Sequence, residues 1–301
     1  MVGCTTPPAP VADALTVGDH GGVQRHELEQ PPRLTIHRGS TQTPMNWPAL
    51  VNEALQADVV ILGEQHNDAI GHAVQLALVK AIVQQAPRAA VALEMLERDE
   101  QPLLDDYRDG IIDANTFAKL TQSEQWAGKG SWGAWYQPII DVGIDNGALV
   151  IAANAPRRYV RRARTNGFDS LDNIDRTRKG FFTTPRKPLM GPYRDRFMDL
   201  MAGHGDEVDL EVQESFFRAQ QMWDATMADS VVDTVRAGHR PVILLVGRFH
   251  SDRGGGTVQF IEQAWPWVKI LVISLEPSLH PGDTPSGGVV EHDDIVVFTN
   301  P

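Results

Sequence analysis

Two short apolar runs in this sequence end in the same pattern of polar residues. The run VVIL leads into GEQHND at residues 63–68, and the run VILLV leads into GRFHSD at residues 247–252. Each glycine lets the chain leave a strand sharply, and His66 or His250 follows three residues later. Imidazoles bind divalent metals and act as general acids and bases. A single such histidine is often only a loop cap, but two in matching contexts favour a functional site.

Two glutamates accompany these histidines. Glu64 lies inside the first turn, and Glu94 closes the run AVALEM, where a carboxylate is out of place unless it has a partner. Two imidazoles and two carboxylates can hold a divalent metal or carry out acid–base chemistry. The pattern therefore predicts Glu64, His66, Glu94 and His250 as catalytic or metal-binding residues. Asp68 is expected only to cap the following helix.

These side chains can meet only if strands deliver them to one edge of a sheet. Seven short runs rich in Val, Ile and Leu are apolar on both faces, as are strands buried in a parallel sheet. In such a sheet the ligand binds beyond the carboxyl ends of the strands, which is where both histidines fall. The runs cover residues 33–38, 58–63, 89–95, 147–154, 241–247, 268–274 and 294–299.

Amphipathic stretches alternate with the apolar runs. Helices are expected over residues 47–56, 69–85 and 213–237. On the last of these, Gln220 and Asp224 share an otherwise apolar face and are expected to face the crevice. The alternation predicts an α/β fold with a mostly parallel sheet flanked by helices.

The alternation of apolar runs and amphipathic stretches also predicts how the chain is divided into a tether, a domain and insertions. Residues 31–301 are expected to form a single α/β domain. Two stretches without a good strand, at about 98–140 and 158–238, are expected to be helical insertions that form a smaller subdomain. Residues 1–30 are rich in Pro, Gly, Asp and His without a period, which is typical of a tether.

The one cysteine of the chain, Cys4, lies in this tether. Its flanks resemble the end of a bacterial lipoprotein signal, although the charged start and apolar core of a signal peptide are not present. They favour a lipid-anchored cysteine over an ordinary exposed one. Thr5, which follows, suits outer-membrane sorting if the cell is Gram-negative. A single cysteine also excludes an intrachain disulfide and the zinc motifs built on paired cysteines.

Composition narrows the class of protein further. The 301 residues are 42% hydrophobic and 22% charged, which is typical of a folded globular protein. The net charge of −12 argues against a nucleic-acid-binding protein. No apolar run approaches the ~20 residues that cross a bilayer.

Two more clusters lie inside the expected insertions. Trp135 and Tyr136 belong to the aromatic segment WGAWYQP, which suits either a core that packs the insertion on the sheet or a site for a planar ligand. The segment RRYVRRAR at residues 157–164 holds five arginines, which pair well with carboxylates and phosphates. Arg157 is nearest to a strand end, and Arg161 is one turn further on. A solvated helix face or an anionic lipid surface remains open as an alternative.

Taken in order, these motifs resemble the ChaN-like haem-binding lipoprotein family, part of the larger Tiki and erythromycin-esterase superfamily. The matching pieces are VVILGEQH, ALEMLER, WGAWYQPII, IAANAPRRYVRR, FFRAQQMWDATMA and ILLVGRFH, within residues 33–300. The resemblance implies a parallel sheet with a small helical subdomain, attachment to the bacterial envelope through a lipidated cysteine, and haem held at a homodimer interface for iron uptake.

With this resemblance, haem becomes the expected cofactor. A haem site needs an axial ligand, an apolar slot and cations for the propionates. The axial ligand is expected to be a tyrosine or a histidine, with the Tyr136 phenolate as the first choice and His66 or His250 as the alternative, and Trp135 is expected to stack on the porphyrin. Arg157 and Arg161 are expected to pair with the propionates.

The superfamily implies a different activity. Its Tiki-type members are metal-dependent proteases, and its esterase branch hydrolyses a lactone. By motif match, Glu64, His66, Glu94 and His250 occupy the active-site positions of these hydrolases, with a divalent metal to polarise the substrate. We expect a haem-binding envelope lipoprotein, and a metal-dependent hydrolase is the alternative.

Overall fold

The computed structural model describes residues 34–39, 41–202, 209–277 and 294–299. The tether expected at residues 1–30 and its Cys4 lie outside these residues.

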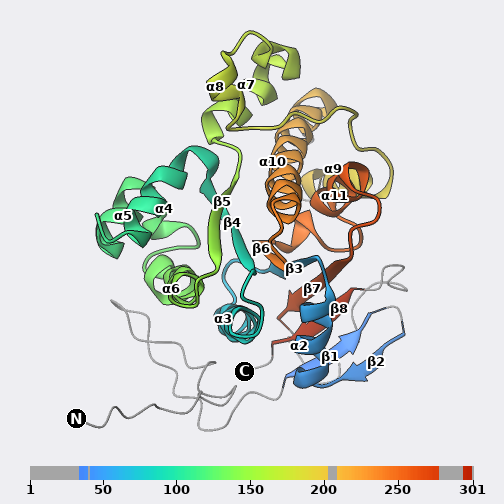
Figure 1. The fold of residues 1–301 in the computed structure, drawn as a ribbon. Coiled ribbons are helices and arrows are strands. Elements are labelled where there is room, and N and C mark those ends of the chain that lie inside the picture. The colour runs from blue at the N-terminus through green and yellow to red at the C-terminus, as the bar shows by residue number, and fades with distance from the viewer. Residues whose placement is uncertain (1–33, 40, 203–208, 278–293, 300–301) are drawn as a thin grey trace, which may run out of the picture.

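A mixed sheet of eight strands, in the order β2-β1-β8-β7-β3-β6-β4-β5, forms the centre of the molecule (Figure 1). Strands β3 to β8 are parallel, whereas β1 pairs antiparallel with both β2 and β8. The predicted α/β class with a mostly parallel sheet is therefore confirmed. The strands are β1 Thr35–Arg38, β2 Thr43–Met45, β3 Val59–Glu64, β4 Ala90–Glu97, β5 Leu149–Asn154, β6 Val242–Gly247, β7 Ile270–Glu276 and β8 Ile295–Phe298.

Strand β2 was not predicted. It has only three residues, one of them Pro44, and it pairs with β1 alone at the edge of the sheet. Proline is tolerated at such an edge, but it hides the strand signal in the sequence.

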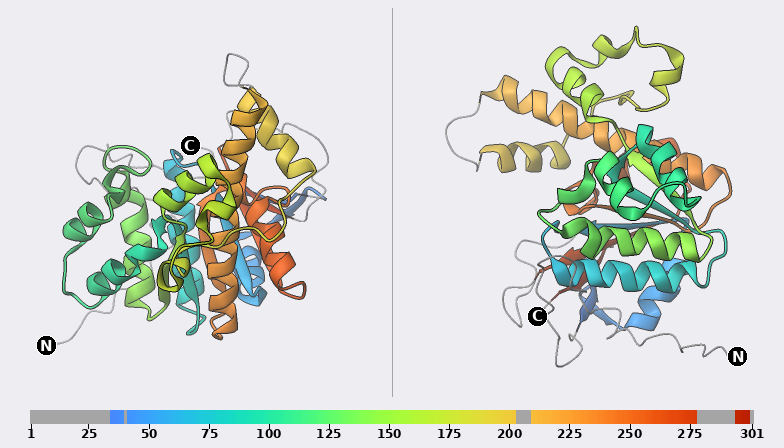
Figure 2. Two further views of the ribbon diagram at one scale, coloured as in Figure 1. Left: turned by 90° about the horizontal axis from the view of Figure 1, so that it is seen from above. Right: turned by 90° about the vertical axis from the view of Figure 1, so that its left-hand side faces the viewer.

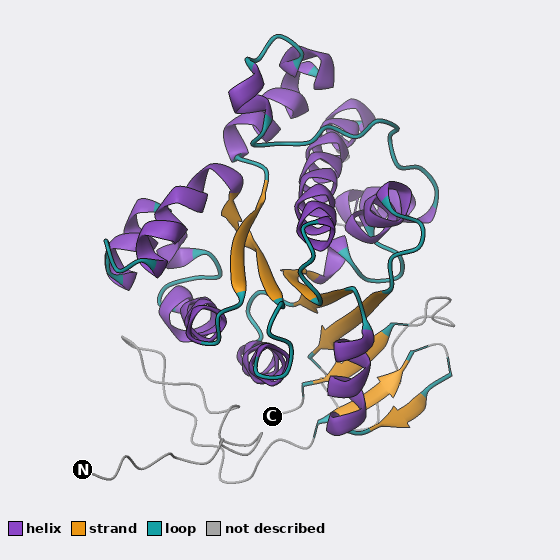
Figure 3. Cartoon of the chain, in the orientation of Figure 1, coloured by secondary structure: helices purple, strands orange, loops and turns teal. Residues whose placement is uncertain are grey.

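Helices pack on both faces of this sheet (Figures 2 and 3). One core contains side chains of α2, α3, α4, α5 and α6, and the other contains side chains of α9, α10 and α11. The helices are α2 Trp47–Gln56, α3 Ala69–Val83, α4 Gln101–Arg108, α5 Ala114–Leu120, α6 Gln137–Asp145, α7 Arg157–Asn166, α8 Arg176–Lys179, α9 Pro192–Ala202, α10 Leu210–Arg236 and α11 Gly256–Ala264.

Alternate residues of the central strands serve these two cores. In β3, Val60 and Leu62 belong to the core with α3, while Val59 and Ile61 belong to the core with α10. This is the two-residue period of a strand whose faces are both buried. Because both faces are covered by helices, a ligand can approach these strands only at their ends.

Among the described residues, none of the helices has the length and apolar character needed to cross a bilayer.

A third, smaller cluster lies at the carboxyl ends of the strands. Helix α7 begins two residues after β5 ends, and it packs with Leu171 and Phe182 against α10. Helices α7 and α8 rise above this edge of the sheet in Figure 1.

Candidate functional site

Three adjacent strands bring the two GxxH turns together. Strand β6 lies between β3 and β4, and its last residue, Gly247, is in register with Glu64 at the end of β3. His66 follows β3, and His250 lies in a short 3₁₀ helix directly after β6. Glu94 lies in β4 directly after Leu93, the last residue of that strand that pairs with β6. The structure thus places all four predicted residues at one edge of the sheet.

Glu64 is the centre of a buried network. One carboxylate oxygen, Oε1, accepts a hydrogen bond from Tyr136 Oη at 2.6 Å and lies 2.8 Å from His66 Nδ1. The other oxygen accepts a hydrogen bond from Gln75 Nε2 at 2.8 Å. Although burial acts to raise it, the hydrogen bond with His66, the nearby His72 ring and the Tyr136 hydroxyl hold the pKa of Glu64 below its usual value. Glu64 is therefore an anion whose oxygens are already engaged.

His66 is the exposed member of this network. Since an ionised carboxylate only accepts hydrogen bonds, Nδ1 of His66 carries the proton that faces Glu64. The same hydrogen bond raises the pKa of His66. Its side chain is 46% exposed, and within the described residues Nε2 has no hydrogen-bond partner. In the neutral ring that nitrogen carries the lone pair, so His66 presents a free, oriented ligand atom.

His250 lies in a second network, which is buried. Its Nδ1 is 2.7 Å from Asp224 Oδ1, and its Nε2 is 3.5 Å from Glu94 Oε1. Asp224, on α10, also accepts hydrogen bonds from Tyr193 and Thr257. Although burial alone would lower it, the charges of Asp224 and Glu94 raise the pKa of His250 to about 9. His250 is thus a buried cation at neutral pH, balanced by Asp224 and Glu94.

Gly247 explains how the two networks fit side by side. Its backbone N–H donates to Glu94 Oε2 at 2.5 Å. A Cβ at this position would lie 3.0 Å from the His66 ring and 3.5 Å from Glu94 Oε2. The His66 ring and the Glu94 carboxylate therefore lie so close to the backbone of residue 247 that a residue larger than glycine would press on both.

The four predicted residues do not form a metal centre. In the part of the chain that the structure covers, no group of three or more His, Cys, Asp or Glu side chains is arranged to hold a metal ion. The oxygens of Glu64 are taken by its donors, and His250 is protonated. The divalent-metal alternative thus gains no support from this geometry.

A small cavity opens beside the two networks. Its volume is about 150 Å³, below the ~300 Å³ at which pockets for organic ligands usually begin. The Arg157 guanidinium lies 4.9 Å from the ring centre of Trp126, and the His66 ring meets Trp126 edge-on at 6.3 Å. Trp126, which lines the cavity, therefore contacts both the Arg157 cation and the His66 ring, which lies just outside the lining residues. The lining residues are Glu94, Glu97, Trp126, Asn154, Ala155, Arg157, Trp223 and His250.

The structure disagrees with the prediction of Tyr136 as an axial ligand. Its side chain is fully buried, and its hydroxyl donates to Glu64. Burial and the Glu64 charge raise the pKa of Tyr136 far above its usual value, so no phenolate is available. Trp135 stacks on His72 with ring centres 4.6 Å apart. Both side chains pack the insertion on the sheet, which is the core alternative for the aromatic segment.

Arg161, which was predicted to pair with a propionate, is exposed on α7.

Several residues of the two networks were missed from sequence. Gln75 and His72 are polar residues three apart on the buried face of α3, and they bond to each other. Two polar side chains inside such an apolar helix need a partner, and this signal could have pointed to Glu64. Tyr193 and Thr257 gave no local signal. Asp224, by contrast, faces His250 as its helical spacing suggested.

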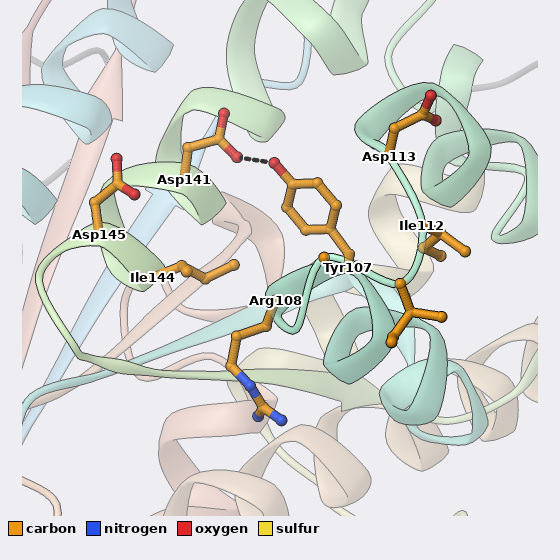
Figure 4. Close-up of a pocket in the computed structure, with 9 residues that line it drawn as sticks. Tyr107, Arg108, Ile112, Asp113, Asp141, Ile144 and Asp145 are labelled. Carbon is orange, nitrogen blue, oxygen red and sulfur yellow. Dashed lines mark hydrogen bonds between the residues drawn. The ribbon is translucent and has the colours of Figure 1, made fainter.

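A larger cavity lies elsewhere, between α4 and α6. Its volume is about 540 Å³, and Figure 4 shows Tyr107 donating to Asp141 at its wall. Asp113 and Asp145 also line it. Three carboxylates and one cation, Arg108, line this cavity, and it contains none of the predicted site residues.

Replacing Gly256 by alanine is expected to destabilise the second network. A Cβ there would overlap the Asp224 carboxylate and lie 2.6 Å from Tyr193 Cε1. Overpacking of this kind typically costs about 1–3 kcal/mol, which urea unfolding would measure. Gly133→Ala is the control, because a Cβ at Gly133 meets nothing within 4 Å. Equal stability of both variants would contradict the close packing.

Comparisons of this chain with known families and solved structures both identify ChaN. The family model described as "Haem-binding uptake, Tiki superfamily, ChaN" matches residues 50–261. A solved structure of ChaN of Campylobacter jejuni, described as showing cofacial haem binding, has a TM-score of 0.66 and 22% identity, over 88% of this chain and 96% of that chain. This likeness supports the fold.

Two further structures are more distant. A protein from Bacillus cereus has a TM-score of 0.48 and 12% identity, over 83% of this chain and 90% of its own. An erythromycin esterase mutant in its open conformation has a TM-score of 0.45 and 13% identity, over 89% of this chain and 83% of its own. No curated protein sequence matches the chain.

Proposed function

Because the chain belongs to the ChaN family of haem-binding uptake proteins in the Tiki superfamily, we propose that it binds haem at the carboxyl edge of its sheet. The observation that carries the proposal is the exposed imidazole of His66, whose Nδ1 is held by Glu64 and whose Nε2 has no partner among the described residues. Haem, when bound, supplies an iron that accepts such a nitrogen as axial ligand.

The surrounding residues suit His66 to this role. A carboxylate on the far nitrogen of a ligating imidazole fixes its tautomer and raises its basicity. Here Glu64 does so, and Tyr136 and Gln75 fix Glu64 in turn. The raised pKa of His66 means that iron must displace a proton at acidic pH, so haem binding is expected to weaken as pH falls.

The mouth of the small cavity suits the rest of the haem. Trp126 and Trp223 offer apolar surface, and Arg157, which pairs with Glu97 but keeps 56% of its side chain exposed, offers a cation for a propionate. A cavity of about 150 Å³ cannot enclose a porphyrin, which must lie across the mouth with one face uncovered. A second copy of the chain would cover that face, so we include a homodimer in the proposal. Cofacial haem binding is described for ChaN of Campylobacter jejuni.

The proposal also covers where the protein acts. We place it in the bacterial envelope, in the outer membrane if the cell is Gram-negative, anchored by a lipid on Cys4 and serving haem or iron uptake. The support is the sequence around Cys4 together with the family. Metabolic labelling with a palmitate analogue in the native bacterium should mark the wild type and fail to mark Cys4→Ala. Labelling of both proteins alike, or of neither, would refute the anchor.

A titration of the purified chain with hemin tests haem binding itself. We expect a saturable, shifted Soret band at low micromolar hemin, because one oriented imidazole and one exposed arginine meet at the mouth. Serum albumin, which binds hemin, and a similarly acidic protein without a haem site serve as positive and negative controls. A weak, non-saturating change like that of the negative control would overturn the proposed function.

A further inference from the structure

One segment of this acidic protein has the opposite charge. Residues 157–187, which we call the basic lobe, hold ten Arg and Lys against three Asp, in a chain with a net charge of −12. The lobe consists of α7, a 3₁₀ helix at Phe168–Leu171, α8 and the loop after α8. Such segregation creates a local positive field on a protein that otherwise repels anions.

The basic lobe is fixed beside the mouth of the site. Its first residue, Arg157, lines the small cavity, and α7 starts directly after the edge strand β5. Tyr159 and Phe182 pack on each other with ring centres 4.8 Å apart, and the cluster they belong to includes Ala219 and Met222 of α10. The lobe is therefore packed on α10 at the carboxyl end of β5, where α7 and α8 rise above the sheet (Figure 1).

The ten cations of the lobe differ in whether they have a partner. Arg162 donates to the Ser170 carbonyl, Arg164 lies over the Phe216 ring, and Arg178 pairs with Asp175. Arg157 and Arg158, next to the sheet, pair with Glu97 and Asp99. A second group is exposed, and its side chains have no ion pair or hydrogen bond with any residue that the structure describes. Since they neither pack nor pair, these side chains contribute little to stability, and their charge is available to solution. The second group consists of Arg161, Arg176, Lys179, Arg186 and Lys187.

We propose that the exposed cations of the basic lobe steer the anionic propionates of haem towards His66; this inference rests on the proposed haem binding. A body carrying the remaining negative charge slows the approach of a dianion, and a positive region at the entrance reverses that effect. Steering of this kind changes association rates by about 10- to 1,000-fold. It acts over roughly 8 Å at physiological ionic strength and about 3 Å at 1 M salt.

Stopped-flow absorbance of hemin binding to the full chain tests the role of the lobe. Two variants with the same net charge are compared, so that only the position of the neutralised cations differs. We expect the association rate of the lobe variant to fall roughly tenfold at low ionic strength. The control variant should change about twofold or less, and dissociation rates should stay the same. The lobe variant carries R176Q, K179Q, R186Q and K187Q, and the control carries R88Q, K119Q, R236Q and K269Q.

Two further measurements distinguish electrostatic steering from haem binding itself. In 1 M salt the difference between the variants should vanish, and haem dimethyl ester, which lacks the propionate charges, should bind both at the same rate. Equal association rates of hemin with both variants, or a change confined to dissociation, would overturn steering while leaving haem binding intact. Absence of saturable binding in the wild type would overturn the proposed function and steering together.

Discussion

Replacing His66 by alanine is expected to weaken haem binding by about a hundredfold or more and to remove the Soret shift. At the mouth of the site, Nε2 of His66 combines exposure with freedom from any partner in the described structure. Stability should change little, because almost half of the side chain is exposed and Glu64 keeps its hydrogen bonds from Tyr136 and Gln75. A hemin titration followed by absorbance, with thermal unfolding alongside, measures both effects.

Tyr136→Phe is the matched control for this prediction. It keeps the buried ring and removes only the hydroxyl that donates to Glu64. We expect it to retain the Soret shift, with an affinity lowered by about tenfold, the lower end of the ~10–100-fold cost of losing an outer-shell partner, because Tyr136 contacts Glu64 and not the His66 ring. If Tyr136→Phe lost the Soret shift while His66→Ala kept it, Tyr136 would be the axial ligand and the arrangement proposed here would be wrong.

The strands and their carboxyl ends could be predicted because their signals are local. Each apolar run is short, is bounded by Gly, Pro or charged residues, and ends in a polar turn, so Glu64 and His250 could be assigned to one sheet edge before any contact was known. Because β3 and β6 are neighbours in the sheet, Glu64 and His250 then lie close together. Strand β2 has no apolar run of this kind, so it could not be predicted.

The role of the aromatic segment could not be predicted in the same way. Tyr136 meets Glu64 across 72 positions of sequence, and only the packing of the insertion against α3 decides that its hydroxyl points inward. A tryptophan and a tyrosine side by side suit a core and a ligand site equally well. The ligand of the proposed haem site therefore changes from Tyr136 to His66 once burial and hydrogen bonding are known.

Asp224→Asn is expected to lower the free energy of unfolding at neutral pH by roughly 3 kcal/mol. Asp224 is fully buried and balances the charge of His250, and removing one partner of a buried ion pair typically costs about 3–5 kcal/mol. Tyr193 and Thr257 also lose the charged acceptor of their hydrogen bonds. Urea unfolding of wild type and variant at pH 6.5 measures the loss.

The wild type should also lose stability in alkaline solution, and the variant should lose less. The pKa of His250 is about 9 in the folded protein against an ordinary 6.5, so folding favours the protonated ring. This contribution is fully present below pH 6.5 and disappears as pH rises through 9. A difference of this size corresponds to roughly 3 kcal/mol. Unfolding curves between pH 6.5 and 9.5 would show the decline.

Asp233→Asn is the control for both effects, because Asp233 is on the same helix but is exposed, and its contact with Arg236 is long at 3.5 Å. It should change stability by less than about 0.5 kcal/mol and leave the alkaline decline unchanged. If Asp224→Asn showed the same decline as the wild type, the charge on His250 would not come from Asp224. Glu94, 3.5 Å from the other ring nitrogen, would then be the partner that holds the proton.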